Sequence, residues 1–135
     1  DKYGYHWIEE YITDPATHII NGFMWGILGV YDLWRFTGDK DALELWDKGV
    51  RTIADNIQKY DSGYWSLYDL AAIPMKNLAS SFYHQLHIVQ LEILFRLTGI
   101  DVLDEICSRW KAYNKNKLNS SRAFFGKAVF KLLYY

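Results

Sequence analysis

Three separate stretches of the sequence carry phenol, carboxylate and imidazole side chains, groups that commonly transfer protons. The central stretch, residues 65–70 (WSLYDL), follows a turn-forming segment and places a phenol directly before a carboxylate. Its composition favours an extended connection, and functional groups often lie on connections held by a rigid scaffold. The residues concerned are Tyr68 and Asp69; Tyr83, His84 and His87; and Glu9, Glu10 and Tyr11. If they meet in space, they suit proton transfer at a sugar, by proton abstraction or by general-acid hydrolysis.

The two histidines near Tyr83 have a spacing that puts them on one side of a helix. Tyr83 and His87 lie four positions apart, and His84 and His87 three, so all three can share a face. An HxxH pair could bind a metal, but here it lacks a third ligand and the HExxH pattern. Histidines of the core, and histidines that orient a substrate, are the other interpretations. We predict no metal and no cofactor, since phosphate-binding glycine loops, GxSxG motifs and cysteine clusters are also missing.

The composition is that of a folded domain. The chain has 135 residues, of which 50% are hydrophobic and 18% aromatic, enough for one domain with its own core. A net charge of -1 gives no indication of a nucleic-acid partner. The lone Cys107 excludes an internal disulfide. The uncharged run at residues 18–31 is too short for a transmembrane segment, which takes roughly 20 apolar residues.

The two ends of the chain differ from the rest. We expect the chain to be part of a longer protein, because it starts at Asp1 without an initiator methionine. Residues 114–135 contain five basic residues and no acidic one, so they form a basic and aromatic tail. Two interpretations of residues 118–135 remain open: an amphipathic helix that starts after Ser120 or Ser121, or an end that docks on another domain or partner.

Four helices are predicted around the three stretches. Asp14 and Pro15 have the cap and first-turn preferences of a helix that runs to about Phe36 and is ended by Gly38. Asp39 is suited to cap a second helix, which extends to about residue 60. Two more are predicted from about Ser80 to Leu97 and from Asp101 to about Tyr113, with residues 1–13 extended and residues 71–79 as a loop.

The first predicted helix carries a stripe of glycines. Gly22, Gly26 and Gly29 recur at i, i+4 and i+7, although each glycine costs ~1 kcal/mol against alanine in a helix. The stripe therefore indicates close contact with another segment, or room for a ligand. Asn21, next to the stripe, is a candidate for a cap or core hydrogen bond or for a ligand contact.

A short repeat relates the two halves of the chain. Residues 35–38 (RFTG) recur as residues 96–99 (RLTG), and each copy separates a largely apolar helix from an amphipathic one. Pairs of inner and outer helices are the unit of α/α toroids, in which neighbouring pairs cover each other's cores. We therefore predict an all-α fold of helical hairpins of the α/α-toroid (incomplete α/α-barrel) type, with residues 1–135 as a single domain.

A series of short motifs occurs in a specific order and spacing. They are Glu10 and Tyr11; residues 21–24 (NGFM); residues 29–33 (GVYDL); Tyr60, Asp61 and Gly63; residues 67–70 (LYDL); residues 77–79 (NLA); Tyr83, His84, His87, Ile88 and Gln90; and Arg109 and Trp110. Together they closely resemble the C-terminal domain of D-glucuronyl C5-epimerases. The resemblance covers roughly residues 5–113, and the basic tail has no counterpart in it.

The resemblance implies an α/α-barrel domain that follows a β-rich domain, missing here, and that inverts C5 of glucuronate in a heparosan-type (heparan sulfate-related) polysaccharide. It implies Glu10 and Tyr83 as the acid/base pair on opposite faces of the sugar, with Tyr68 as an auxiliary phenol. It also allows for a homodimer, and for a fragment that is inactive by itself. The residues implied to orient the substrate or the catalytic groups are Tyr11, Asn21, Asp69, His84 and His87.

The chain departs from the family pattern at two positions. Where animal members carry arginine, this chain has Ala71 and Ser80, and arginine is a good clamp for a carboxylate. Two other functions fit the same residues. One is an α/α-toroid glycoside hydrolase or lyase, with Asp69 or Glu9 as its second carboxylate. The other is a non-catalytic helical module that binds carbohydrate.

Overall fold

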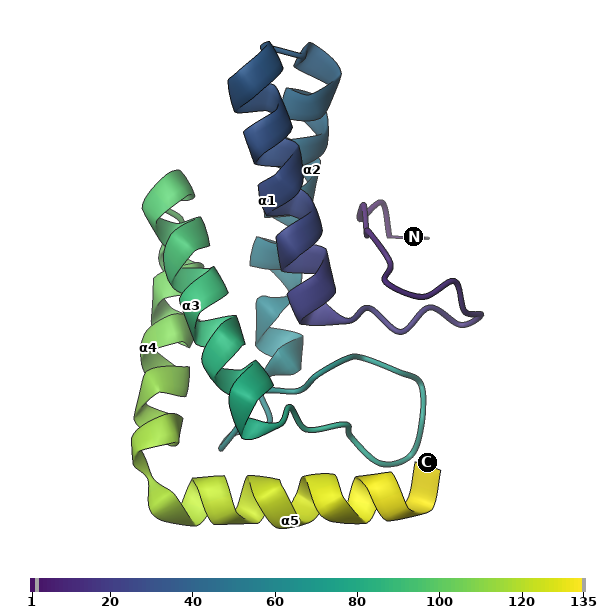
Figure 1. Ribbon diagram of the computed structural model, residues 1–135, viewed down its shortest axis with the longest axis vertical. Coiled ribbons are helices and arrows are strands. Elements are labelled where there is room, and N and C mark those ends of the chain that lie inside the picture. The colour runs from purple at the N-terminus through teal and green to yellow at the C-terminus, as the bar shows by residue number, and fades with distance from the viewer. Residues whose placement is uncertain (2, 135) are drawn as a thin grey trace.

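The computed structural model describes residues 1 and 3–134, which form two helical hairpins and a fifth helix (Figure 1). The helices are α1 (Ile20–Thr37), α2 (Lys40–Asn56), α3 (Ser81–Thr98), α4 (Asp101–Lys115) and α5 (Lys117–Tyr134), with a 3-10 turn, η1 (Ile57–Tyr60), directly after α2. No strand occurs in the described residues, which contain only isolated bridges at Asp61–Ser66 and Leu67–Leu78. The predicted all-α class is confirmed, whereas the toroid arrangement stays a prediction.

The repeated Thr-Gly motif ends the first helix of each hairpin. Gly38 and Gly99 adopt left-handed φ values of 71° and 68°, and their backbone N–H groups donate to Trp34 O and Phe95 O. Glycine is favoured there because a Cβ would be strained in this conformation. The predicted cap of α2 is also present, since the Asp39 side chain accepts from two backbone N–H groups of its first turn.

The predicted start of the first helix is wrong. Asp14 and Pro15 lie in an irregular segment, joined by a cis peptide bond, and α1 begins only at Ile20. The backbone of residues 17–20 instead forms hydrogen bonds with the central connection. Ile20 N donates to Tyr68 O at 3.2 Å, and Leu70 N donates to Thr17 O at 2.8 Å. These bonds fix the connection of residues 65–70 against the beginning of α1.

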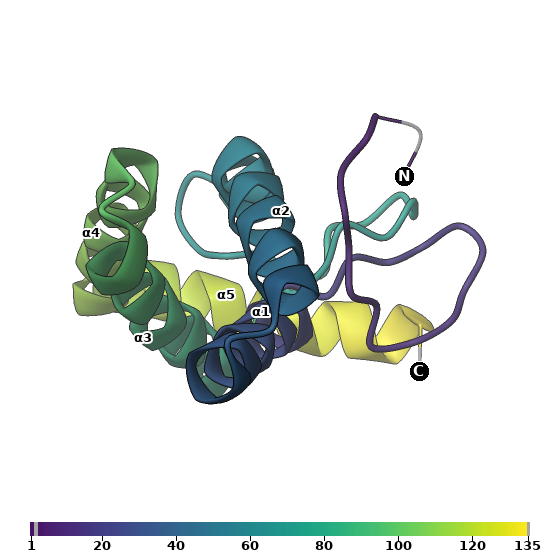
Figure 2. The ribbon, with the colours of Figure 1, turned by 90° about the horizontal axis from the view of Figure 1, so that it is seen from above.

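Large aromatic side chains fill the core between the hairpins and the connection. Trp65, Trp110 and Tyr60 are completely buried. The Tyr60 hydroxyl donates to His18 O at 2.7 Å, and Trp65 Nε1 donates to Ala79 O at 3.0 Å. The Tyr60 and Trp65 rings thus combine a large apolar contact with a satisfied polar end. Viewed from above, the N-terminal segment and part of the loop after Trp65 lie on the same side of the hairpins (Figure 2).

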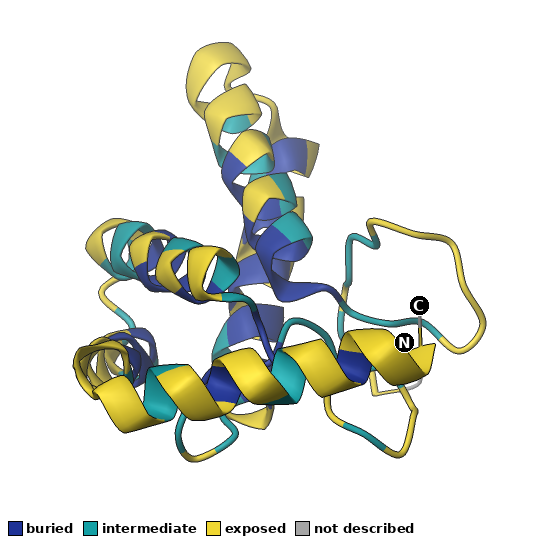
Figure 3. Ribbon diagram, turned by 60° about the horizontal axis from the view of Figure 1, so that its bottom comes forward, coloured by how far each residue is buried: buried dark blue, intermediate teal, exposed yellow. Residues whose placement is uncertain are grey.

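Helix α5 runs across the open ends of both hairpins (Figures 1 and 3). Of the two interpretations left open for residues 118–135, the helix is present as far as Tyr134, although α5 begins at Lys117 rather than after Ser120; Tyr135 lies outside the described residues. Only isolated positions of α5, Ala123 and Phe130, are buried. None of the helices in the described part of the chain has both the length and the apolarity needed to cross a membrane.

Candidate functional site

Two buried histidines hold the connection that carries Tyr68. His84 Nε2 lies 3.2 Å from Trp110 O, so that nitrogen carries the proton, because a carbonyl can only accept. Ser66 Oγ then donates to His84 Nδ1 at 2.8 Å and accepts from His87 Nδ1 at 3.0 Å. Trp65 also stacks on His84, with ring centroids 3.8 Å apart. The imidazoles therefore anchor residues 65–66 to α3 and α4.

Burial keeps both imidazoles neutral. His84 and His87 have no exposed surface, and burial lowers the pKa of His84 to about 4 and that of His87 to about 3. A charged imidazole is disfavoured in an interior that cannot solvate it. Their hydrogen bonds go to Ser66 of the connection and to Trp110 O, and neither histidine lines the cavity described below. Within the described residues, no cluster of three potential metal ligands occurs around them or elsewhere.

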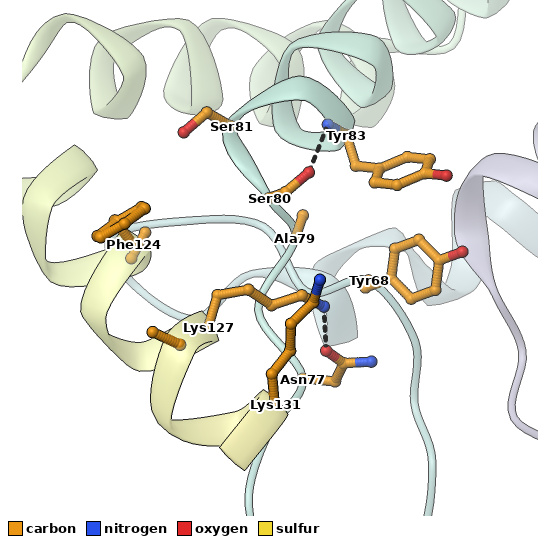
Figure 4. Close-up of a pocket in the computed structure, with 11 residues that line it drawn as sticks. Tyr68, Asn77, Ala79, Ser80, Ser81, Tyr83, Phe124, Lys127 and Lys131 are labelled. Atoms are coloured by element: carbon orange, nitrogen blue, oxygen red, sulfur yellow. Dashed lines mark hydrogen bonds between the residues drawn. The ribbon is translucent and has the colours of Figure 1, made fainter. Parts of the chain in front are cut away.

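Tyr68 and Tyr83 meet at the wall of a cavity of about 610 Å³. Their rings pack edge to face, with centroids 4.9 Å apart, and their hydroxyls point to the same side (Figure 4). Burial first, and then the nearby Glu10 carboxylate and Tyr83 hydroxyl, raise the pKa of Tyr68 well above its usual value near 10. Tyr68 is therefore a hydrogen-bond donor at neutral pH and not a ready base.

Glu10 reaches this region from the N-terminal segment. Its side chain lies over Gly22 of α1, with Oε2 only 2.6 Å from the position that a Cβ on Gly22 would take. Ile8 lies over Gly26 in the same way, at 3.0 Å. The glycine stripe is thus explained at two positions by close contact with this segment. The charges of Glu10 and Tyr11 both raise the pKa of Tyr68, so the stretch with Glu10 lies within electrostatic range of the stretch with Tyr68, although none of the described residues that line the cavity comes from it.

The remaining predicted residues have structural contacts. Glu9 forms an ion pair with His18 and accepts from its backbone N–H at 3.0 Å. Asp69 accepts from Asn77 Nδ2 at 2.6 Å and from the backbone N–H of residue 71 at 3.1 Å. Asn21 is buried, and its backbone carbonyl accepts from Gln90 Nε2 at 3.0 Å. Asp69 and Asn21 thus contact the elements that frame the cavity.

The structure adds three residues that sequence reasoning did not select. Asn77, Lys127 and Lys131 line the same cavity as the two tyrosines (Figure 4). Lys127 Nζ donates to Asn77 Oδ1 at 2.6 Å. The only signal for the lysines was the basic, acid-free composition of residues 114–135. Nothing in that composition indicated which lysines would face inward.

Comparisons with known proteins agree with the motifs. The chain is 30% identical over 130 residues to the D-glucuronyl C5-epimerase of Caenorhabditis elegans, covering 85% of this chain and 21% of that protein. It is also 30% identical over 107 residues to the uncharacterized protein MJ1128 of Methanocaldococcus jannaschii, covering 79% of this chain and 33% of the relative. The chain therefore spans a third or less of the length of these relatives. The family described as D-glucuronyl C5-epimerase C-terminus matches residues 1–112, and the chain belongs to this family.

Proposed function

We propose that this chain forms the C-terminal catalytic part of a uronyl C5-epimerase that acts on glucuronate within an acidic, heparosan-type polysaccharide. The observation that carries the proposal is the packing of Tyr68 against Tyr83 at one cavity, with Glu10 near enough to raise the pKa of Tyr68 by its charge. Phenols and a carboxylate in this arrangement suit removal and return of a proton. The family membership supports the same class of reaction.

In the proposed reaction, one group of the pair Glu10 and Tyr83 takes the proton from C5, and the electrons of the C–H bond move into the adjacent carboxylate. The other group then returns a proton to the opposite face of C5, which inverts it. Tyr68, kept protonated by its surroundings, donates a hydrogen bond to the negative charge that develops in between. His84 and His87 act indirectly, by fixing the segment that carries Tyr68.

Hydrolysis or lyase chemistry is the second candidate. Glycoside hydrolysis uses two carboxylates on either side of the scissile bond. The two candidates for the second carboxylate, Glu9 and Asp69, both have partners in the local structure. Because both carboxylates are already engaged by these partners, the epimerase is favoured over the hydrolase. The β-rich N-terminal domain and the homodimer remain predictions.

The test is incubation of the full-length protein that contains this chain with a glucuronate-containing polymer in D2O. We expect deuterium at C5 without chain cleavage, measured by NMR, and loss of exchange in the Tyr83→Phe and Glu10→Gln variants. Tyr31→Phe and Glu105→Gln are matched controls, because Tyr31 packs on Trp46 and Glu105 is exposed on α4. General acid–base groups typically contribute ~10²–10⁴-fold. Exchange retained in both site variants would refute the assignment.

Other products would select another function. New reducing or unsaturated ends would favour the hydrolase or lyase. Binding of the polymer with neither exchange nor cleavage would leave a carbohydrate-binding module.

A further inference from the structure

The cavity beside Tyr68 and Tyr83 has a positively charged edge that comes entirely from α5. Lys127 and Lys131 lie one helical turn apart, on the same face of α5, and both line the cavity. No carboxylate occurs among the described residues that line it. In the close-up, both lysine side chains extend toward the Tyr68 ring, on the side away from its hydroxyl (Figure 4). Two ammonium groups that share a wall without an acid between them favour an anionic ligand.

Lys127 is held in place by a short chain of hydrogen bonds. Its Nζ donates to Asn77 Oδ1 at 2.6 Å, and Asn77 Nδ2 donates to Asp69 Oδ2 at 2.6 Å. The same Nζ lies 5.1 Å from the centre of the Tyr68 ring. Burial and the charge of Lys131 lower the pKa of Lys127, while the charge of Asp69 opposes them. The ammonium group is therefore fixed beside the phenol rather than extended into solvent.

Helix α5 packs at several points against the segment of residues 64–78, part of which lines the cavity. Ala123 and Phe130 are buried. The Arg122 guanidinium lies 3.8 Å from the centre of the Tyr64 ring. Leu78 packs closely against Gly126, since a Cβ added to Gly126 would lie 2.8 Å from Leu78 Cδ1. These contacts make α5 part of the wall, although it lies beyond residues 1–112, which the family matches.

We propose that Lys127 and Lys131 bind the carboxylate of the sugar residue that occupies this cavity. The inference rests on the proposed function and extends it to a helix outside the family match. The proton at C5 is adjacent to this carboxylate, so pairing the carboxylate with fixed cations also stabilises the charge that develops when the proton leaves.

Binding measurements test this without requiring turnover. The ligands are a glucuronate oligosaccharide and the same oligosaccharide with its carboxyl groups reduced to alcohols, compared by titration calorimetry. The wild-type chain should prefer the uronate form. We expect Lys127→Met and Lys131→Met each to reduce that preference about tenfold, because a hydrogen bond to a charged group is lost. Lys127→Arg should retain most of it, since the charge is kept.

The matched control is Lys117→Met, which removes an exposed lysine at the start of the same helix and should leave the preference unchanged. Circular dichroism checks that each variant stays helical, and Lys131, at a solvent-exposed position, can be changed without disturbing the core. An undiminished preference in both methionine variants would overturn the inference, and so would a wild-type chain without any preference.

Exchange at C5 separates this inference from the proposed function. Exchange that persists while both methionine variants keep the uronate preference supports the epimerase and overturns the role of the lysines. A preference that depends on the lysines, in a full-length protein that contains this chain and never exchanges the C5 proton, supports the carboxylate site and refutes the epimerase.

Discussion

Replacing Gly22 by alanine should separate stability from activity, because Glu10 lies directly over this glycine. The new Cβ would stand 2.6 Å from Glu10 Oε2, whereas ordinary van der Waals contact begins at 3.4 Å. The carboxylate must therefore move by about 0.8 Å, and a misplacement of about 1 Å can cost ~10²-fold in rate. The atom that must move is the end of a flexible side chain, so the fold tolerates the change.

In the same Gly22→Ala variant, the free energy of unfolding should increase while the exchange rate falls. Alanine is favoured over glycine in a helix by up to ~1 kcal/mol, so Gly22→Ala should raise the stability measured by urea titration. Gly29→Ala is the matched control on the same helix, because no atom lies within 4 Å of the added Cβ. We expect it to stabilise the chain equally and to leave exchange intact.

The assay is deuterium incorporation at C5 in both variants, alongside their urea unfolding curves. Slow exchange in Gly22→Ala with wild-type exchange in Gly29→Ala is the expected result. Equal exchange in the two variants would refute the role of Glu10 as an acid/base group.

Two further predictions concern stability. His84 and His87 have pKa values of about 4 and about 3 in the fold, against 6.5 ordinarily, so below pH 6.5 the unfolded chain binds more protons. The contribution of these two histidines to stability is complete above that pH and is lost as pH decreases. The free energies of unfolding from urea titrations at pH 7 and pH 5 should therefore differ by about 2 kcal/mol per histidine. His87→Gln should reduce this difference; a pH dependence of the urea midpoint in this variant equal to that of the wild type would contradict the argument. Asp39→Ala should cost about 1 kcal/mol by removing the cap of α2; an unchanged urea midpoint would show that the cap contributes nothing.

The hairpins could be predicted because their signals are local. Gly38 and Gly99 end helices by a conformation that glycine alone adopts readily. The start of α1 could not be predicted in this way. Asp14 and Pro15 satisfy the local preferences for a helix start, but the following backbone pairs with residues 68–70, which are distant in sequence. Tertiary hydrogen bonds therefore override the local preference.

The same distinction applies to the candidate site. Spacing predicted that His84 and His87 share a face of α3, but it could not tell whether that face meets the substrate or the core. The structure places it in the core, against Ser66. Lys127 was not predictable as a site residue, because its orientation depends on how α5 packs on Asn77 and its neighbours.

The cavity is closed by the last helix, since Ala123, Lys127 and Lys131 of α5 line it together with Tyr68 and Tyr83. Contacts between residues so far apart in sequence form slowly compared with those inside a helical hairpin. A folding intermediate that contains only the two hairpins therefore has no complete cavity. A ligand that binds there recognises only the fully assembled chain and stabilises that state against partial unfolding, by an amount that grows with the logarithm of its concentration.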